Sequence, residues 1–233
     1  MLRLVTLGLL LLLGSSLAQA LELKPFVATY QFNLDDKLKG TATRTLERRG
    51  PKLWNYTFAA SAPFASASET SDFTFDGRVV QPMGYQQVRN IVFSKKRAAI
   101  AFDWRDHKGT GTRDDKPTVT YPLVPGTLDE INMEIQIRRD LVELGKLAGP
   151  YTLATPKDAA PLEFVVEGTE VITTPYGKLT TLRVSRKHTG NKRHTTFWLA
   201  REFDYLPARV VQNDGGMVYS LELSSVDYPK ASN

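Results

Sequence analysis

Short alternating segments separated by turn residues most constrain how this chain folds. Apolar and polar residues alternate along many short stretches, which Gly, Pro, Asn and Asp residues separate. This pattern is typical of antiparallel strands that bury one face and expose the other to water. Two of the breaks, Asp76-Gly77 and Asn213-Asp214-Gly215-Gly216, are preferred hairpin turns. The predicted strands are 26–32, 39–46, 53–58, 69–75, 85–93, 97–104, 162–174, 179–187, 195–199, 208–212 and 217–226, with a turn expected at 106–111.

One stretch departs from this alternation and predicts a helix over 128–144. Thr127 and Glu130 have the spacing of a capping box, in which each side chain satisfies a free amide of the first turn. Gly145 or Gly149-Pro150 supplies the stop. The alternative is a pair of short strands, which the capping box disfavours. Apolar residues recur at helical spacing at Leu128, Ile131, Ile135 and Val142, with Ile137, Leu141 and Leu144 beside them.

We expect these elements to form a single β-rich domain over 21–229, followed by a loose tail at 230–233. Apolar residues make up 42% of the chain, which is enough to bury a sizeable core. A flat sheet would leave an apolar face and two edges uncovered, whereas a curved sheet with a helix against its open side covers both. The sequence therefore predicts a mainly β fold: a curved antiparallel sheet or an incomplete β-barrel, with the one α-helix packed against it.

The first twenty residues have the pattern of a secretory signal peptide. Arg3 provides a positive start, 4–13 is an apolar run, and Ala18-Gln19-Ala20 fits a cleavage site after Ala20. The apolar run is too short to anchor the chain stably in a bilayer, although an uncleaved anchor is the alternative. The chain contains no cysteine, which excludes disulfides, a thiol nucleophile and a lipid-modified N-terminal cysteine. We therefore expect a periplasmic protein.

Charge indicates what kind of partner to expect. The formal net charge of +5 is mild; it is compatible with an anionic lipid or polysaccharide and is not a nucleic-acid signature. Membrane contact is expected to be peripheral at most. A basic cluster is the candidate contact with an anionic surface, and a solvated loop that protects a sheet edge is its alternative. The cluster comprises Arg186, Lys187, His188, Lys192 and Arg193, and Arg44, Arg48 and Arg49 form a looser patch with the same alternative.

Several short segments, in order along the chain, resemble one known family. They are Leu23-Lys24-Pro25-Phe26 with Ala28-Thr29-Tyr30, the helix start at Leu128-Asp129, the stretch from Pro175-Tyr176-Gly177-Lys178-Leu179 to Val184, and Thr196-Phe197-Trp198-Leu199-Ala200 with Tyr205-Leu206-Pro207-Ala208-Arg209. The chain resembles an exported bacterial family catalogued as domain of unknown function 3108. The resemblance spans essentially the whole chain after the signal and implies a periplasmic β-rich domain. It implies no reaction and no catalytic residues.

No catalytic constellation, metal site or cofactor site is predicted. His188 and His194 could face each other across a hairpin, but no acidic residue between Glu170 and Glu202 completes a metal site locally. His107 lies in a polar turn. A serine-hydrolase elbow, G-x-S-x-G, does not occur. Carboxylates close to predicted strand ends are expected to serve turns; they are Asp72, Asp76, Asp103 and Asp106.

Aromatic residues supply the candidates for ligand binding, namely Trp104, Trp198 and Tyr205. A concave apolar face could hold an acyl chain, with the helix as plug or lid, although core packing is the commoner use of aromatic residues. The sequence leads us to expect a protein that is not an enzyme and that binds an amphiphile or envelope component. One alternative is a scaffold for an envelope assembly or secretion machine, which would meet a protein partner. Another is a hydrolase whose carboxylates converge only in the fold.

Overall fold

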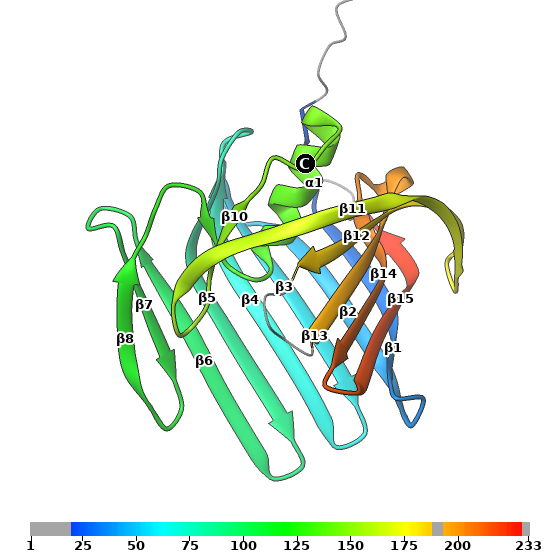
Figure 1. Cartoon of the computed structure of the whole chain (residues 1–233), viewed down its shortest axis with the longest axis horizontal. Helices are drawn as coiled ribbons and strands as arrows, with labels where there is room; N and C mark the ends of the chain where they lie inside the picture. Colours follow the sequence, from blue (N-terminus) through cyan, green and yellow to red (C-terminus); the bar gives the residue numbers. More distant parts are fainter. Residues whose placement is uncertain (1–19, 188–192, 230–233) are drawn as a thin grey trace, which may run out of the picture.

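Strands dominate the computed structural model, which describes residues 20–187 and 193–229 (Figure 1). This part of the chain holds the α-helix α1 (Asn132–Leu144), the short 3-10 helix η1 (Arg201–Phe203) and a fifteen-stranded sheet. The predicted signal peptide, apart from Ala20, and the tail 230–233 lie outside the described residues. The strands are β1 (Phe26–Leu34), β2 (Leu38–Arg48), β3 (Leu53–Ala62), β4 (Ala65–Phe75), β5 (Val80–Ile91), β6 (Ser94–Asp103), β7 (Lys108–Arg113), β8 (Lys116–Pro122), β9 (Thr127–Leu128), β10 (Tyr151–Ala154), β11 (Ala159–Thr174), β12 (Gly177–Lys187), β13 (Arg193–Ala200), β14 (Leu206–Asp214) and β15 (Met217–Asp227).

Hairpins build the sheet almost entirely from neighbours in sequence. Its strand order is β8-β7-β6-β5-β4-β3-β2-β1-β15-β14-β13-β12-β11-β10-β9. The first strand, β1, lies in the middle of the sheet, where it pairs with β2 on one side and with the last strand, β15, on the other. All neighbours are antiparallel except β9 and β10, which are parallel. The predicted turn at Asp76 forms because its Oδ1 accepts hydrogen bonds from the backbone N–H groups of Arg78 and Val79, both at 2.9 Å.

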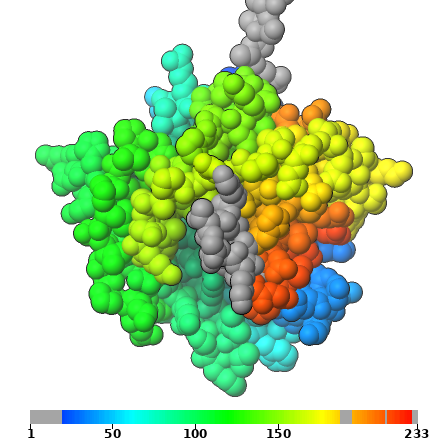
Figure 2. Space-filling view, in the orientation of Figure 1, coloured from blue at the N-terminus to red at the C-terminus, as the bar shows by residue number. Residues whose placement is uncertain are grey.

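The sheet curls until its two ends approach each other, and it does not close. Strand β9 lies beside β5, and β11 crosses the front of the curl (Figures 1 and 2). The turn between β10 and β11 packs against β7 and β8, where the Tyr121 hydroxyl donates to the Thr155 carbonyl at 2.9 Å. A Cβ atom at Gly111 would lie 2.5 Å from the Pro156 carbonyl oxygen, so only glycine permits this approach. The predicted incomplete β-barrel with one helix is confirmed.

The helix packs across one end of the curl, and it begins later than the sequence predicted (Figure 1). Thr127 and Leu128 belong to β9, and the Thr127 hydroxyl donates to the Val124 carbonyl at 2.8 Å instead of capping a helix. The N-cap residue is Ile131, and the buried Asp129 carboxylate holds the turn before it by accepting from the N–H groups of Ile131 and Asn132. The capping-box prediction was therefore wrong. Gly145, the first of the two predicted stops, ends the helix in a left-handed conformation, φ 68°.

Strands β7 and β8 contradict the turn predicted at 106–111, because β7 already begins at Lys108. Their sequences, KGTGTR and KPTVTYP, carry almost no apolar residues at alternate positions. Glycine takes their place on the covered side of the strand. A Cβ atom at Gly109 would lie only 2.3 Å from the Cε2 atom of the Tyr121 ring, so no larger residue fits there. A pattern based on apolar alternation cannot detect a strand that buries glycine beneath a neighbouring aromatic ring.

The core lines the concave face of the sheet and the side of α1 that faces it. Alternate residues of each strand point inwards, as the period of two requires. Across the described chain, no helix combines the length and the apolar character needed to cross a membrane. The largest fully buried side chains come from β1 to β4, β9, β12, β14, β15 and the helix segment; they include Phe26, Tyr30, Leu46, Tyr56, Phe73, Leu128, Ile135, Val184, Leu206 and Leu223.

Candidate functional site: the interior cavity

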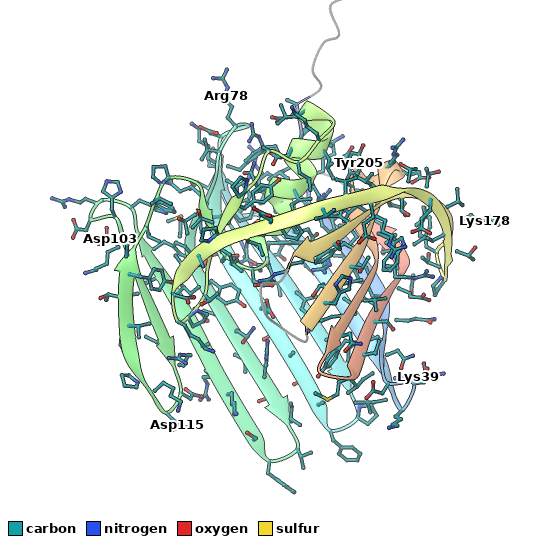
Figure 3. The ribbon with its side chains drawn as sticks, viewed as in Figure 1. Lys39, Arg78, Asp103, Asp115, Lys178 and Tyr205 are labelled. Carbon is teal, nitrogen blue, oxygen red and sulfur yellow. The ribbon has the colours of Figure 1, made fainter. Side chains whose placement is uncertain are left out.

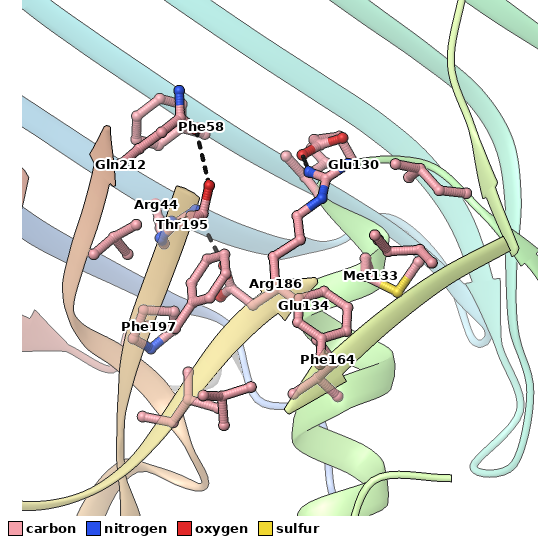
Figure 4. Close-up of a pocket in the computed structure, with 18 of the residues that line it drawn as sticks. Arg44, Phe58, Glu130, Met133, Glu134, Phe164, Arg186, Thr195, Phe197 and Gln212 are labelled. Carbon is pink, nitrogen blue, oxygen red and sulfur yellow. Dashed lines mark hydrogen bonds and ion pairs between the residues drawn. The ribbon is translucent and has the colours of Figure 1, made fainter. Parts of the chain in front are cut away.

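A cavity of about 160 Å³ lies between α1 and the concave face of the sheet (Figure 4). A dry cavity of about 150 Å³ can hold a benzene-sized molecule, whereas drug-sized ligands need roughly 300 Å³ or more. The space therefore matches a small apolar group. Its apolar wall comprises Phe58, Ile131, Met133, Ile137, Leu153, Leu162, Phe164, Val184, Phe197, Leu199, Pro207 and Val210. The polar residues that line it are Arg44, Glu69, Glu130, Glu134, Arg186, Thr195 and Gln212.

A buried ion pair connects β2 to the helix at this cavity. The Arg44 Nη1 lies 3.1 Å from the Glu134 Oε2, and the two side chains are only 9% and 12% exposed. The guanidinium also lies over the rings of Tyr30 and Phe58, 5.6 and 5.0 Å from their centroids. The Tyr56 hydroxyl donates to the other Glu134 oxygen. Aromatic faces, a hydroxyl donor and a fixed counter-charge thus compensate both buried charges.

Two tyrosines beside this pair are held in their neutral, hydrogen-donating form. Burial is the largest cause that raises the pKa of Tyr56 well above its ordinary value, and the Glu134 carboxylate raises it further. Burial likewise raises the pKa of Tyr30, whose hydroxyl donates to the Pro207 carbonyl at 3.0 Å. Removing a proton from either tyrosine would place a second negative charge next to Glu134, so the two hydroxyls stay protonated near neutral pH.

A second, more open polar cluster forms another part of the wall. The Arg186 Nη1 contacts the Glu130 Oε1 at 2.6 Å, with side chains 16% and 45% exposed. Nearby, Glu69 accepts hydrogen bonds from the Tyr85 hydroxyl at 2.9 Å and the Gln87 amide at 3.0 Å. Burial raises the pKa of Glu69, and the Glu130 carboxylate raises it further. The cluster therefore brings an arginine, a carboxylate and a carboxyl group that binds protons more tightly than usual to one cavity.

The N-terminus of the helix is fixed by a third polar cluster, built around Asp129. Its carboxylate accepts from the Ser71 hydroxyl at 2.6 Å and from the Asn132 side-chain amide at 2.9 Å, besides the two backbone amides. Burial raises the pKa of Asp129 to about 6, although these hydrogen bonds lower it. No arginine or lysine forms an ion pair with it in the described ranges 20–187 and 193–229. The cluster anchors α1 to β4, and thereby positions Glu130 and Glu134.

None of the three aromatic candidates lines the cavity. Trp104 follows β6, stacks on Phe102 and donates its indole N–H to the Pro82 carbonyl at 2.6 Å. Trp198 lies on the opposite face of β13 from the cavity residues and donates to Glu170 at 2.7 Å. Tyr205 follows η1 in a left-handed conformation, at the helix end of the molecule (Figure 3).

The structure also separates the members of the two basic groups. Arg186 points to the cavity and Glu130, instead of lying on the solvated tip suggested by the sequence. Lys187 and Arg193 belong to β12 and β13, but their side chains, like Lys192, lie outside the described part of the structure. Their contact with an anionic surface stays a prediction. Of the looser patch, Arg44 is buried at the cavity, whereas Arg48 and Arg49 are exposed.

The other predicted features serve local structure. Asp103 accepts from the N–H groups of Arg105 and Asp106, as expected of a turn residue. Asp72 accepts from the Asn55 amide at 2.7 Å. His188 falls outside the described residues. Among the residues with a described position, no three His, Cys, Asp or Glu side chains gather as metal ligands would.

Fold and site together define an open β-barrel that surrounds a small cavity and is plugged at one end by a helix. The family comparison names the group: the model described as "Protein of unknown function (DUF3108)" matches residues 28–221, and the chain belongs to this family. The fold is similar to a solved structure described as a β-barrel-like protein of domain of unknown function DUF1849 from Brucella abortus. That likeness has a TM-score of 0.58 and 14% identity and covers 91% of this chain and 100% of the other. A comparison with curated proteins found no match.

The charged residues of the cavity were missed, although the alternation contained a signal for them. Arg44 shares its face of β2 with Ala42 and Leu46, both fully buried. Arg186 follows Val184 at the same spacing on β12. Because side chains alternate across a strand, a charged residue in phase with buried neighbours lies on the face that points inwards. Phase alone is not sufficient, because Arg48 is in phase with Arg44 and is exposed where β2 ends.

Proposed function

We propose that this protein is a non-enzymatic periplasmic binding protein whose interior cavity takes the apolar part of a small amphiphile. The observation that carries the proposal is the division of the cavity wall into an extended apolar side and a polar cluster of Glu69, Glu130 and Arg186. An apolar space with few, convergent polar groups is the usual form of a small-molecule site. The export expected from the first twenty residues would place it where envelope amphiphiles occur.

Arg186 is the best candidate to bind an anionic head group. Its Nε atom is buried and has no hydrogen-bond partner among the described residues, so one donor of its fork is free. The Glu130 side chain that holds Nη1 is 45% exposed and can move into water when a carboxylate or phosphate replaces it. The Nε atom of Arg44 also lacks a partner, but aromatic rings and the buried Glu134 enclose that guanidinium. Arg186 is therefore the exchangeable arginine.

A titration with alkyl carboxylates of increasing chain length tests this proposal, with alkyl alcohols of equal length for comparison. We expect carboxylates to bind more tightly than alcohols. Arg186→Gln should remove that preference, because a bond between a charged donor and acceptor contributes about 1.5–3 kcal/mol. Arg183→Gln is the matched control, since Arg183 lies on the same strand, is exposed and pairs with Glu167 at 2.6 Å. Equal binding of both ligand series, or equal loss in both variants, would contradict the proposal.

A hydrolase is the second candidate, because Glu69 and Glu130 reach the same cavity and Glu130 raises the pKa of Glu69. A proton-bearing carboxyl beside an ionised one is the arrangement used for acid–base hydrolysis. Turnover of glycosidic or ester substrates that Glu69→Gln abolishes would favour the hydrolase over the binding protein. The scaffold alternative predicts instead that the cavity variants leave function intact and that a partner protein binds the outer surface.

A further inference from the structure

Two neighbouring hairpin turns present large apolar side chains to water. Phe64, between β3 and β4, is 84% exposed, and Phe93, between β5 and β6, is fully exposed. Ile91 and Val92 beside Phe93 are 60% and 65% exposed. We call these four residues the tip patch. Single exposed apolar residues are ordinary on protein surfaces. Four of them on adjoining turns form an apolar patch, which is typical of an interaction surface.

A backbone hydrogen bond connects the two turns. The N–H of Val92 donates to the carbonyl of Phe64 at 2.8 Å. Phe64 and Val92 both adopt left-handed conformations, with φ of 64° and 51°. Glycine or asparagine is the favourable choice at such positions, and a β-branched valine is strained there. The sequence thus keeps apolar residues at the turns although polar turn residues would fit the backbone better.

Basic residues flank the tip patch on β5 and β6. Arg89, Lys95 and Lys96 are exposed, Arg89 faces Lys96 across the hairpin, and none of the three has an ion-pair partner in residues 20–187 and 193–229. Arg97, the next basic residue, is paired with Asp114 at 3.7 Å. No acidic residue occurs in the stretches 60–68 or 88–98 that form the two turns and their flanks. The patch is therefore apolar at its tip and positive behind it.

The two turns lie at the end of the curl opposite the helix (Figure 1). Figure 3 marks the two ends: Asp115 and Lys39 lie at the end of these turns, and Arg78 at the helix end. At this end the turns project beyond the body of the sheet, so a flat surface can meet them without meeting α1.

We propose that the tip patch docks the protein on a phospholipid bilayer that carries anionic head groups. The phenylalanines and the two aliphatic residues enter the interface between head groups and acyl chains, and Arg89, Lys95 and Lys96 contact the phosphates. The combination of apolar anchors and adjacent basic residues is what peripheral attachment to an anionic bilayer requires. This surface is separate from the interior cavity, so it does not depend on the function proposed for that cavity.

Co-flotation of the purified protein with vesicles tests this inference. The probes are vesicles of phosphatidylcholine alone and vesicles of equal parts phosphatidylcholine and phosphatidylglycerol. We expect binding to the mixed vesicles, weaker binding to the neutral ones, and a loss of the difference at high salt. Failure of the protein to float with mixed vesicles would overturn the proposal.

Paired variants separate the apolar and the basic contributions. Phe64→Ser with Phe93→Ser should weaken binding at least about tenfold per phenylalanine, and Lys95→Gln with Lys96→Gln about fivefold per lysine on the mixed vesicles alone. The matched controls are Val79→Ser with Val171→Ser, both exposed, and Lys157→Gln with Lys178→Gln. The tip variants remove only exposed side chains, so their thermal unfolding should match that of the unchanged protein.

Two further outcomes would overturn the inference. One is equal weakening by the tip variants and their controls, which would indicate non-specific attraction. The other is cross-linking of a protein to the tip patch without vesicle binding, which would assign the surface to a protein partner.

Discussion

Two arginine–glutamate pairs join the sheet to the helix segment, and they differ in burial far more than in chemistry. Arg44 and Glu134 are 9% and 12% exposed and have aromatic and hydroxyl partners besides each other. Arg186 and Glu130 are 16% and 45% exposed, and Glu130 lies just before the helix begins. The buried pair, Arg44 with Glu134, cannot separate without leaving an uncompensated charge. The more exposed pair, Arg186 with Glu130, can separate, because water or a ligand can replace either partner. The first pair is therefore suited to stabilising the fold, whereas the second is the pair that we propose for binding.

Breaking the buried pair should have the largest effect. Arg44→Met leaves Glu134 buried without its counter-charge, and we expect the free energy of unfolding to fall by about 3–5 kcal/mol. Urea unfolding followed by tryptophan fluorescence measures the loss. Arg44→Met with Glu134→Met should recover part of it, because the double variant buries no charge. A loss below about 1 kcal/mol in the single variant would show that the pair is not what holds the helix to β2.

Asp129 sharpens the comparison, because it is a buried carboxylate with hydrogen bonds but no arginine. Its folded-state pKa of about 6 lies above the ordinary value, so its stabilising contribution is fully present below about pH 4 and is lost as the pH rises through 6. Relative to Asp129→Asn, the unchanged protein should lose up to about 3 kcal/mol between pH 4 and pH 7. Chemical unfolding of both proteins across this range measures the difference, and a pH-independent difference would contradict the assignment.

The hydroxyl of Tyr56 tests how much the buried pair depends on its neutral partner. Tyr56→Phe removes one hydrogen bond to the ionised Glu134, and we expect a loss of about 2 kcal/mol in unfolding free energy. Tyr121→Phe is the control, because Tyr121 donates to a neutral carbonyl, that of Thr155 in the turn between β10 and β11. It should lose only about 1 kcal/mol. Equal losses in the two variants would indicate that the charge on Glu134 adds nothing.

The more exposed ion pair, Arg186 with Glu130, should contribute least to stability. Arg186→Gln is expected to change the free energy of unfolding by less than about 1 kcal/mol, since Glu130 remains hydrated when its partner is removed. Thermal and urea unfolding measure this, alongside the ligand titration described above. If Arg186→Gln destabilised the protein as strongly as Arg44→Met, the distinction between a stabilising and a binding arginine would fail.

Most of the fold was accessible from local pattern. The hairpins from β1 to β6 and from β11 to β15 follow alternation and turn residues, both of which act between residues close in sequence. The end of α1 was accessible too, since Gly145 is a local stop signal. The start of α1 was not, because Thr127 is drawn into β9 by pairing with Thr152, a partner distant in sequence. A local helix-start signal fails where a strand distant in sequence pairs with the same backbone segment.

The cavity was less accessible than the fold. Phase along a strand indicates that Arg44 and Arg186 point inwards, but it does not give their partners. Glu134 and Glu130 meet these arginines only because the curl of the sheet carries β2 and β12 to the same helix segment. The tip patch was not predicted, because the sequence placed Ile91, Val92 and Phe93 within a strand at 85–93 and assigned no turn at Phe64, and its exposure depends on how far the hairpins project.

By itself, the sequence determined an antiparallel sheet of hairpins and one helix that ends at the first of its two stop signals, Gly145. Only the tertiary structure decided how far the sheet curls, which arginine meets which glutamate, and which pair stays buried. Alternation and turn preference are properties of adjacent residues, whereas curvature and pairing arise from contacts between residues far apart in the chain.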